Sequence, residues 1–191
     1  MNHQKSMHVM DFLLSRRSDS ARTLVKPAPD GESLEKILTA AARTPDHGKL
    51  IPWRFLVLKN QVLLKIATSI HEIGRAKQID QEKLRKNVDI FSNAPLIVAV
   101  ISSPRSNEKI PLIEQQLSAG AVCLALLNAS HADGWGANWL TGWMSHDKSF
   151  LETVFDLSEQ EFVAGFIHIG TRTTQSVERP RPDLKKITSW L

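Results

Sequence analysis

Arginine and serine side chains that could bind a phosphate follow the first apolar repeat of the chain, in the run Ser15-Arg16-Arg17-Ser18. Guanidinium groups bind phosphate through paired hydrogen bonds, and a serine hydroxyl adds a further donor. Arg22 stands nearby, and more arginines lie in the tail, Arg172 and the stiff run Arg179-Pro180-Arg181-Pro182. Cations are also common at helix C-termini and in solvated tails. These residues alone therefore leave phosphate binding and ordinary surface charge both open.

Two further segments could line a flat ligand. One is the polar loop 44–49 with the Pro-Trp corner that follows it, and the other is the glycine- and tryptophan-rich segment 134–142. Glycines allow close backbone approach, and backbone N–H groups can bind the polar edge of a planar ring. The segment is not a dinucleotide fingerprint, because it lacks the third glycine and follows a helical pattern. The ordinary alternatives are a turn role for His47 and a core or interface role for the tryptophans.

Other chemistries find little support in the residues. The seven histidines are scattered without metal-ligand spacing, and there is neither a Walker-type loop nor a Gly-x-Ser-x-Gly elbow. The one cysteine, Cys123, excludes an internal disulfide and suits a reducing compartment. Its place in the apolar run 119–127 is typical of a small buried thiol, and a nucleophile has no His or acid at a suggestive local spacing.

The overall composition indicates one globular domain. The chain has 191 residues, of which 42% are hydrophobic and 23% charged, and its net charge is +4. With no linker and no internal repeat, we expect residues 1–191 to form a single soluble domain. So small a basic excess is ordinary for a solvated surface. Residues 1–5 are polar and the longest apolar runs are shorter than a membrane span, so we expect no export signal, no membrane partner and a cytoplasmic location.

Apolar periodicity predicts the elements that must position these clusters. Spacings of three and four residues predict helices ending near Arg16, over 34–41, from Val62 to Gly74, over 113–132 and over 151–155. Apolar or β-branched runs predict strands over 54–58, 96–102, 138–141 and 162–169. The charged stretch 77–89 is interpreted as an exposed helix or lid, and the tail from Gly170 as extended. Strands that alternate with helices predict an α/β or α+β sandwich with one sheet.

In their order and spacing, the clusters resemble the nitroreductase family, and within it a short single-domain branch. The similarity runs from about Leu13 to the C-terminal region, and each motif alone is weak. The matching residues are Arg16-Arg17-Ser18, Ala42-Arg43-Thr44-Pro45-Asp46-His47, Pro52-Trp53-Arg54-Phe55, Ala94-Pro95-Leu96-Ile97, Glu114-Gln115, Ser118-Ala119-Gly120, Gly134-Trp135-Gly136, Gly165-Phe166-Ile167 and Gly170-Thr171.

The resemblance implies a fold, a cofactor and an assembly. The fold is an α+β, three-layer α-β-α sandwich with a central, mostly antiparallel sheet, and two chains form an intertwined homodimer with two FMN molecules at their interface. Arg16, Arg17 and Ser18 would hold the ribityl-phosphate part of FMN, with Arg181 and Arg179 completing the phosphate site. His47 and Ile51 would reach the flavin from the partner subunit. Trp139, Leu140 and Thr141 would run past the flavin ring.

Two residues depart from the branch's usual pattern. Ile51 stands where glutamine is usual before Pro-Trp, and Leu140 stands where close relatives carry an arginine. Both changes make the expected pocket more apolar, which could shift the flavin potential or the choice of substrate.

The chemistry implied by the resemblance belongs to the flavin. NADH or NADPH would deliver hydride, and an electrophilic small molecule such as a nitroaromatic or a quinone would then take electrons in ping-pong turnover. Arg16 or Lys49 could supply positive charge near the reduced flavin, and no protein acid or base is identified. Enone reduction or reductive dehalogenation on the same scaffold is the alternative reaction. A basic nucleic-acid-binding module is the alternative of another class, although the arginines do not interleave with aromatic residues as such modules require, so we expect no nucleic-acid partner.

Overall fold

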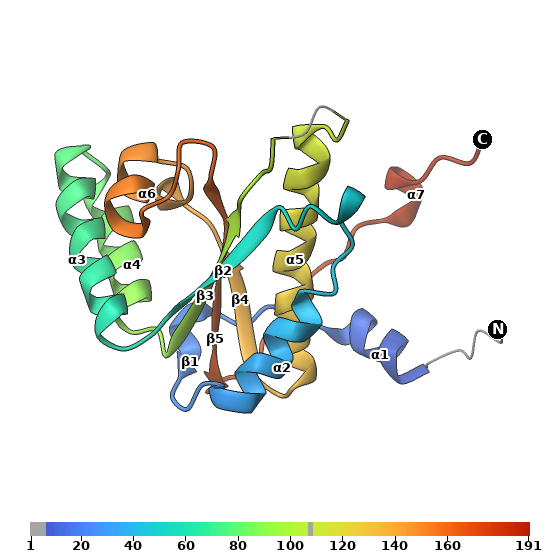
Figure 1. Ribbon diagram of the computed structural model, residues 1–191. Coiled ribbons are helices and arrows are strands. Elements are labelled where there is room, and N and C mark those ends of the chain that lie inside the picture. The colour runs from blue at the N-terminus through green and yellow to red at the C-terminus, as the bar shows by residue number, and fades with distance from the viewer. Residues whose placement is uncertain (1–6, 107–108) are drawn as a thin grey trace.

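The computed structural model describes residues 7–106 and 109–191 (Figure 1). Residues 1–5, on which the expectation of no export signal partly rests, lie outside this description. The helices are α1 (Met7–Ser15), α2 (Gly31–Ala41), α3 (Gln61–Ala76), α4 (Gln81–Ser92), α5 (Leu112–Ala132), α6 (Lys148–Phe155) and α7 (Leu184–Ile187). The strands are β1 (Leu24–Val25), β2 (Trp53–Leu58), β3 (Leu96–Ser102), β4 (Gly136–Leu140) and β5 (Phe162–Arg172).

One sheet organises the chain, and its strand pairings are all antiparallel. The order is β1-β5-β3-β2, with β4 also paired to β5. The register places Trp53 opposite Ser102, Leu96 opposite Ile169, and Gly136 opposite Gly170. The strand β3 is buried along its whole length, as its β-branched, uninterrupted apolar sequence predicts.

Helices cover both faces of the sheet (Figure 1). Ile97, Ala99 and Ile101 face one core, which α3, α4 and α6 complete. The intervening residues of β3 face a second core, which is completed by α2 and α5. The α+β, three-layer sandwich with an antiparallel sheet is therefore confirmed.

Some elements differ from the sequence-based expectations. The third helix does not end at Gly74 but continues to Ala76, and Gly74 is buried where a Cβ would lie 2.5 Å from a methyl group of Leu84. The glycine thus lets α4 pack closely on α3. For the charged stretch 77–89, the helix is confirmed and the lid is not, because most of the stretch belongs to α4, whose Leu84 and Phe91 are buried in the core. The tail begins as extended backbone, since β5 runs on to Arg172, but it also contains the short helix α7.

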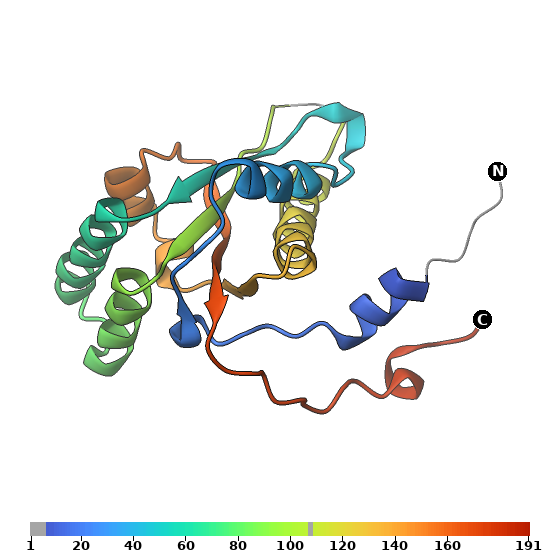
Figure 2. The same ribbon diagram turned by 90° about the horizontal axis from the view of Figure 1, so that it is seen from below.

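The first helix and the tail extend from the same side of the body, as two perpendicular views show (Figures 1 and 2). Both carry large apolar side chains that the chain itself leaves exposed, among them Leu14, Ile187 and Trp190. By length and composition alone, α5 is the one helix among the described residues that could cross a membrane. It packs against the sheet and α2, as core helices of similar composition do.

Candidate functional site

Arg16 follows directly on the last turn of α1, where its N–H still donates to the Phe12 carbonyl at 2.8 Å. Its Nη1 atom is buried and has no hydrogen-bond partner among the described residues. Burial lowers the pKa of Arg16, and the nearby guanidinium groups of Arg181, Arg17 and Arg179 lower it further. A bound anion would pair with this buried nitrogen and would offset the repulsion among the neighbouring guanidinium groups.

The tail brings the other arginines to this point. Arg17 donates to the Val177 carbonyl and forms an ion pair with Glu178, N to O 3.2 Å. Arg181 forms an ion pair with the same carboxylate at 3.0 Å. Hydrogen bonding from the Arg179 N–H and contacts with Arg181 and Arg17 lower the pKa of Glu178. The arginines at 16, 17, 179 and 181 are here called the arginine cluster, and two of them, Arg17 and Arg181, already pair with one carboxylate.

Asp19 ties the arginine cluster to β4 and the tail. Its buried carboxylate accepts hydrogen bonds from the Ala137 N–H at 3.0 Å and from the Ser176 hydroxyl at 3.1 Å. The same hydroxyl reaches the Ser18 carbonyl at 3.1 Å, so Ser18 lies within the site. His131, in the last turn of α5, places Nδ1 3.7 Å from the Asp19 carboxylate. Sequence reasoning missed Asp19 and His131, because neither belongs to a local motif.

The strand β4 runs from the arginine cluster along α5. Trp139, on β4, packs its indole ring over β5, where its Nε1 donates to the Ala164 carbonyl at 3.1 Å. A Cβ at Gly165 would lie 2.2 Å from that nitrogen, so only glycine leaves room for the indole. Trp139 is 36% exposed, Leu140 is half-buried and Thr141 is exposed. Trp139 and Thr141 are therefore accessible at the C-terminal end of β4.

His47 and Ile51 lie near the other end of α5. His47 Nδ1 is 2.7 Å from the Glu114 carboxylate, and the Ile51 N–H donates to Asp46 at 2.9 Å. The loop is strained, because Ile51 has φ of 50° and Lys49 has φ of 55°. A β-branched residue in this region is an outlier, and such strain is typical of ligand-binding segments.

Within one chain, the loop that carries His47 and Ile51 does not lie beside the arginine cluster. The helix α5 rises about 1.5 Å per residue, so Glu114 and His131 are separated by about 25 Å along it. His47 and Ile51 therefore lie far from the arginine cluster of their own chain.

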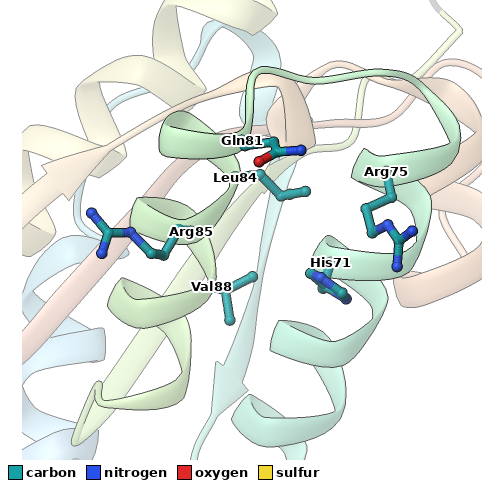
Figure 3. Close-up of a pocket in the computed structure, with 6 residues that line it drawn as sticks. All are labelled: His71, Arg75, Gln81, Leu84, Arg85 and Val88. Carbon is teal, nitrogen blue, oxygen red and sulfur yellow. The ribbon is translucent and has the colours of Figure 1, made fainter.

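Two other groups of cations lie outside this site. Arg22 does not join the arginine cluster but lines a cavity of about 520 Å³ with Arg85, Lys86 and Asp89. A cavity of about 460 Å³ opens between α3 and α4, on the far face of the sheet from α5 (Figure 3). Among the described residues, no group of His, Cys, Asp and Glu has the arrangement of a metal site.

Comparisons with known proteins agree on one family. The model of the Nitroreductase family matches residues 13–171. "Putative NAD(P)H nitroreductase YdjA" of Escherichia coli (strain K12) is 32% identical over 179 residues, which are 92% of this chain and 96% of the relative. "Putative NAD(P)H nitroreductase" of Haemophilus influenzae is 35% identical over 188 residues, 97% of this chain and 100% of the relative.

Solved structures share the fold at lower identity. The nitroreductase-like family protein from Bacillus cereus superposes with a TM-score of 0.80 at 19% identity, covering 100% of this chain and 98% of that chain. A putative nitroreductase in complex with FMN from Desulfovibrio desulfuricans superposes with a TM-score of 0.72 at 22% identity, covering 97% and 96%.

Proposed function

Because the chain belongs to the Nitroreductase family, we propose that it is an FMN-dependent oxidoreductase that takes hydride from NADH or NADPH. The relatives' names, and the FMN complex of one structural neighbour, support this cofactor and this donor. The observation that carries the proposal is the buried Nη1 of Arg16 within the arginine cluster, which has no hydrogen-bond partner in the described part of the chain.

The arginine cluster fits the phosphate of FMN. A phosphate monoester carries close to two negative charges at neutral pH and three strong acceptor oxygens. Arg16 would offer its unpaired nitrogen, while Arg17 and Arg181 would exchange the Glu178 carboxylate for phosphate oxygens. Ser18, half-buried beside them, would add its hydroxyl. The protein thus needs little rearrangement to bind the cofactor's anionic end.

The bound flavin supplies hydride and electron transfer, and the protein residues bind and orient it. Trp139, Leu140 and Thr141 would line the ring and keep water from one side of it. Nitroaromatics, quinones and similar electrophilic small molecules are the proposed oxidants, reduced in ping-pong turnover. The apolar side chains of Ile51 and Leu140 favour oxidants with little charge.

A second copy of the chain would complete the site. On α5, the side chains of Ile113, Leu117 and Leu124 share one helix face, and 46–65% of each remains exposed. If two such faces pack antiparallel, the first turn of one α5 meets the last turn of the other. His47 and Ile51 of the partner subunit would then lie beside the arginine cluster. The exposed apolar residues of α1 and the tail would be buried in the same homodimer, and light scattering of the flavin-loaded protein should give twice the chain mass.

The single cysteine bears on the cellular compartment. Cys123 is buried, and burial raises its pKa to about 12, so it is an unreactive core thiol. We propose a cytoplasmic location, which suits a free cysteine and a nicotinamide donor.

Anaerobic half-reactions test the proposal. FMN bound to the native protein should lose its visible absorbance when NADH or NADPH is added, and regain it on addition of a nitroaromatic or a quinone. Arg16→Ala should lose most bound FMN, whereas Arg22→Ala, which removes an exposed guanidinium outside the cluster, should keep it. A native protein that binds no FMN, or whose FMN neither nicotinamide reduces, would overturn the proposal.

A further inference from the structure

His131 lies beside the arginine cluster and has no part in the function proposed above. Only 6% of its side chain is exposed. Its Nδ1 faces the Asp19 carboxylate at 3.7 Å, and the Ala137 carbonyl also favours a proton on the ring. Its Nε2 is buried with no hydrogen-bond partner among the described residues. Two buried nitrogens, Nη1 of Arg16 in the cluster and Nε2 of His131 beside it, therefore have no hydrogen-bond partner among the described residues.

The groups around His131 act on its pKa in opposite directions. Burial lowers its pKa, and the guanidinium groups of Arg172 and Arg16 lower it further, while Asp19 raises it. The C-terminal carbonyls of α5 also favour a cation in the last turn. Asp133, which caps this helix, is already engaged by Lys36 and Ser33. Without a further anion, the imidazole is neutral at pH 7.

An oxyanion in the arginine cluster would reverse this balance. It would offset the charge of Arg16, one of the two arginines that repel the imidazolium, and it would bring acceptor oxygens close to the buried Nε2. We propose that His131 takes up a proton from solvent on Nε2 when an oxyanion binds in the arginine cluster, and so becomes an additional cation and N–H donor for the FMN phosphate. Asp19 would act as a positioning residue, holding Nδ1 so that Nε2 carries the new proton. This inference rests on the proposed phosphate site.

Proton uptake predicts the direction of a pH effect. The pKa of His131 would be higher in the anion-bound state than in the free state. Its contribution to affinity is then full below the free-state pKa and is lost as pH rises through the bound-state pKa. Sulfate is the clean probe, because it stays a dianion across the range in which the FMN phosphate itself titrates, near pH 6.

The direct test is a histidine NMR titration of protein freed of FMN by dialysis, with and without saturating sulfate. The His131 ring signal is assigned by its loss in His131→Gln. Sulfate should raise the His131 pKa by about one unit or more, which corresponds to about tenfold tighter sulfate binding at low pH than at high pH. The ring signal of the exposed His71, on α3, is the internal control, and sulfate should leave it unchanged. A His131 pKa that sulfate leaves unchanged would overturn the inference.

Two further measurements separate this inference from the proposal on which it rests. Calorimetry of sulfate binding to the native protein, in buffers of different ionisation enthalpy, should show proton uptake, so the test stands even if His131→Gln does not fold. In His131→Gln, sulfate affinity should lose its pH dependence. If neither sulfate nor FMN binds, the phosphate site itself is wrong. If both bind without proton uptake, only the role of His131 is wrong, and its ring merely supports Asp19.

Discussion

His168 provides a stringent test of the packing described above. It lies in the middle of β5, opposite Ile97 of β3 and Asn138 of β4, and it is fully buried. Neither ring nitrogen has a hydrogen-bond partner among the described residues, and the ring meets Phe91 edge-on at 5.7 Å. Burial lowers the pKa of His168 to about 3. The folded protein therefore keeps this imidazole neutral.

The magnitude follows from linkage between protonation and folding. In the unfolded chain a histidine titrates near pH 6.5. Below that pH, the unfolded state therefore binds a proton that the folded state does not bind. Each pH unit between 6.5 and about 3 then costs about 1.4 kcal/mol of folding free energy. At pH 5, His168 alone should lower the free energy of unfolding by about 2 kcal/mol relative to pH 7.

Urea unfolding of the native protein and of His168→Leu, at one protein concentration and at pH 7 and pH 5, measures this effect. Leucine fills a similar volume without unpaired polar atoms, so the variant should be at least as stable at pH 7 and should lose about 2 kcal/mol less on acidification. His71→Leu, at an exposed position, should follow the native protein. If native protein and His168→Leu lose stability in parallel, the imidazole is not buried and neutral as described.

Three other changes probe the site and its support. Ile51→Gln should raise the FMN midpoint potential by about 10–30 mV, because a neutral hydrogen bond to the reduced flavin is worth about 0.5–1.5 kcal/mol; an unchanged or lower potential in a potentiometric titration would contradict this. Gly165→Ala should cost about 1–3 kcal/mol in urea unfolding and displace Trp139 from its hydrogen bond, which tryptophan fluorescence would report; unaltered stability and emission would argue against this packing. Glu161→Gln should cost about 1–2 kcal/mol at pH 7, because Glu161 makes two hydrogen bonds to the partly exposed Arg54. Since Arg54 holds the Glu161 pKa at about 2, this difference should shrink as pH falls from 4.5 towards 2, and a constant difference would be inconsistent.

Local patterns were enough to predict the layers of the fold. The apolar run of β3 and the long apolar helix α5 have periodicities that identify them without tertiary information. The two-residue strand β1 carries no such pattern and exists only because β5 pairs with it. The sequence predicted that a helix would end at Gly74. In the structure, the missing side chain of Gly74 leaves room for Leu84 of the next helix, and a contact between two helices cannot be predicted from local sequence.

The candidate site was predictable only in part, for a similar reason. Arg16, Arg17 and Arg181 lie together because the tail folds back onto the end of α1, while their role in binding FMN stays a prediction. His131 and Asp19 belong to segments with no chemical motif, and packing of α5 against the start of β4 joins them. Whether His47 and Ile51 meet the cluster remains a prediction, because it depends on a second chain.

The most direct measurement of the central claim compares FMN with riboflavin, which is the same flavin without its phosphate. The arginine cluster predicts that the native protein binds FMN about 100-fold more tightly, since charge-assisted hydrogen bonds are worth about 1.5–3 kcal/mol each. Arg16→Ala should weaken FMN binding and leave riboflavin binding unchanged. Flavin fluorescence titrations give all four dissociation constants. Equal affinities for FMN and riboflavin in the native protein would contradict a phosphate site at Arg16, Arg17 and Arg181.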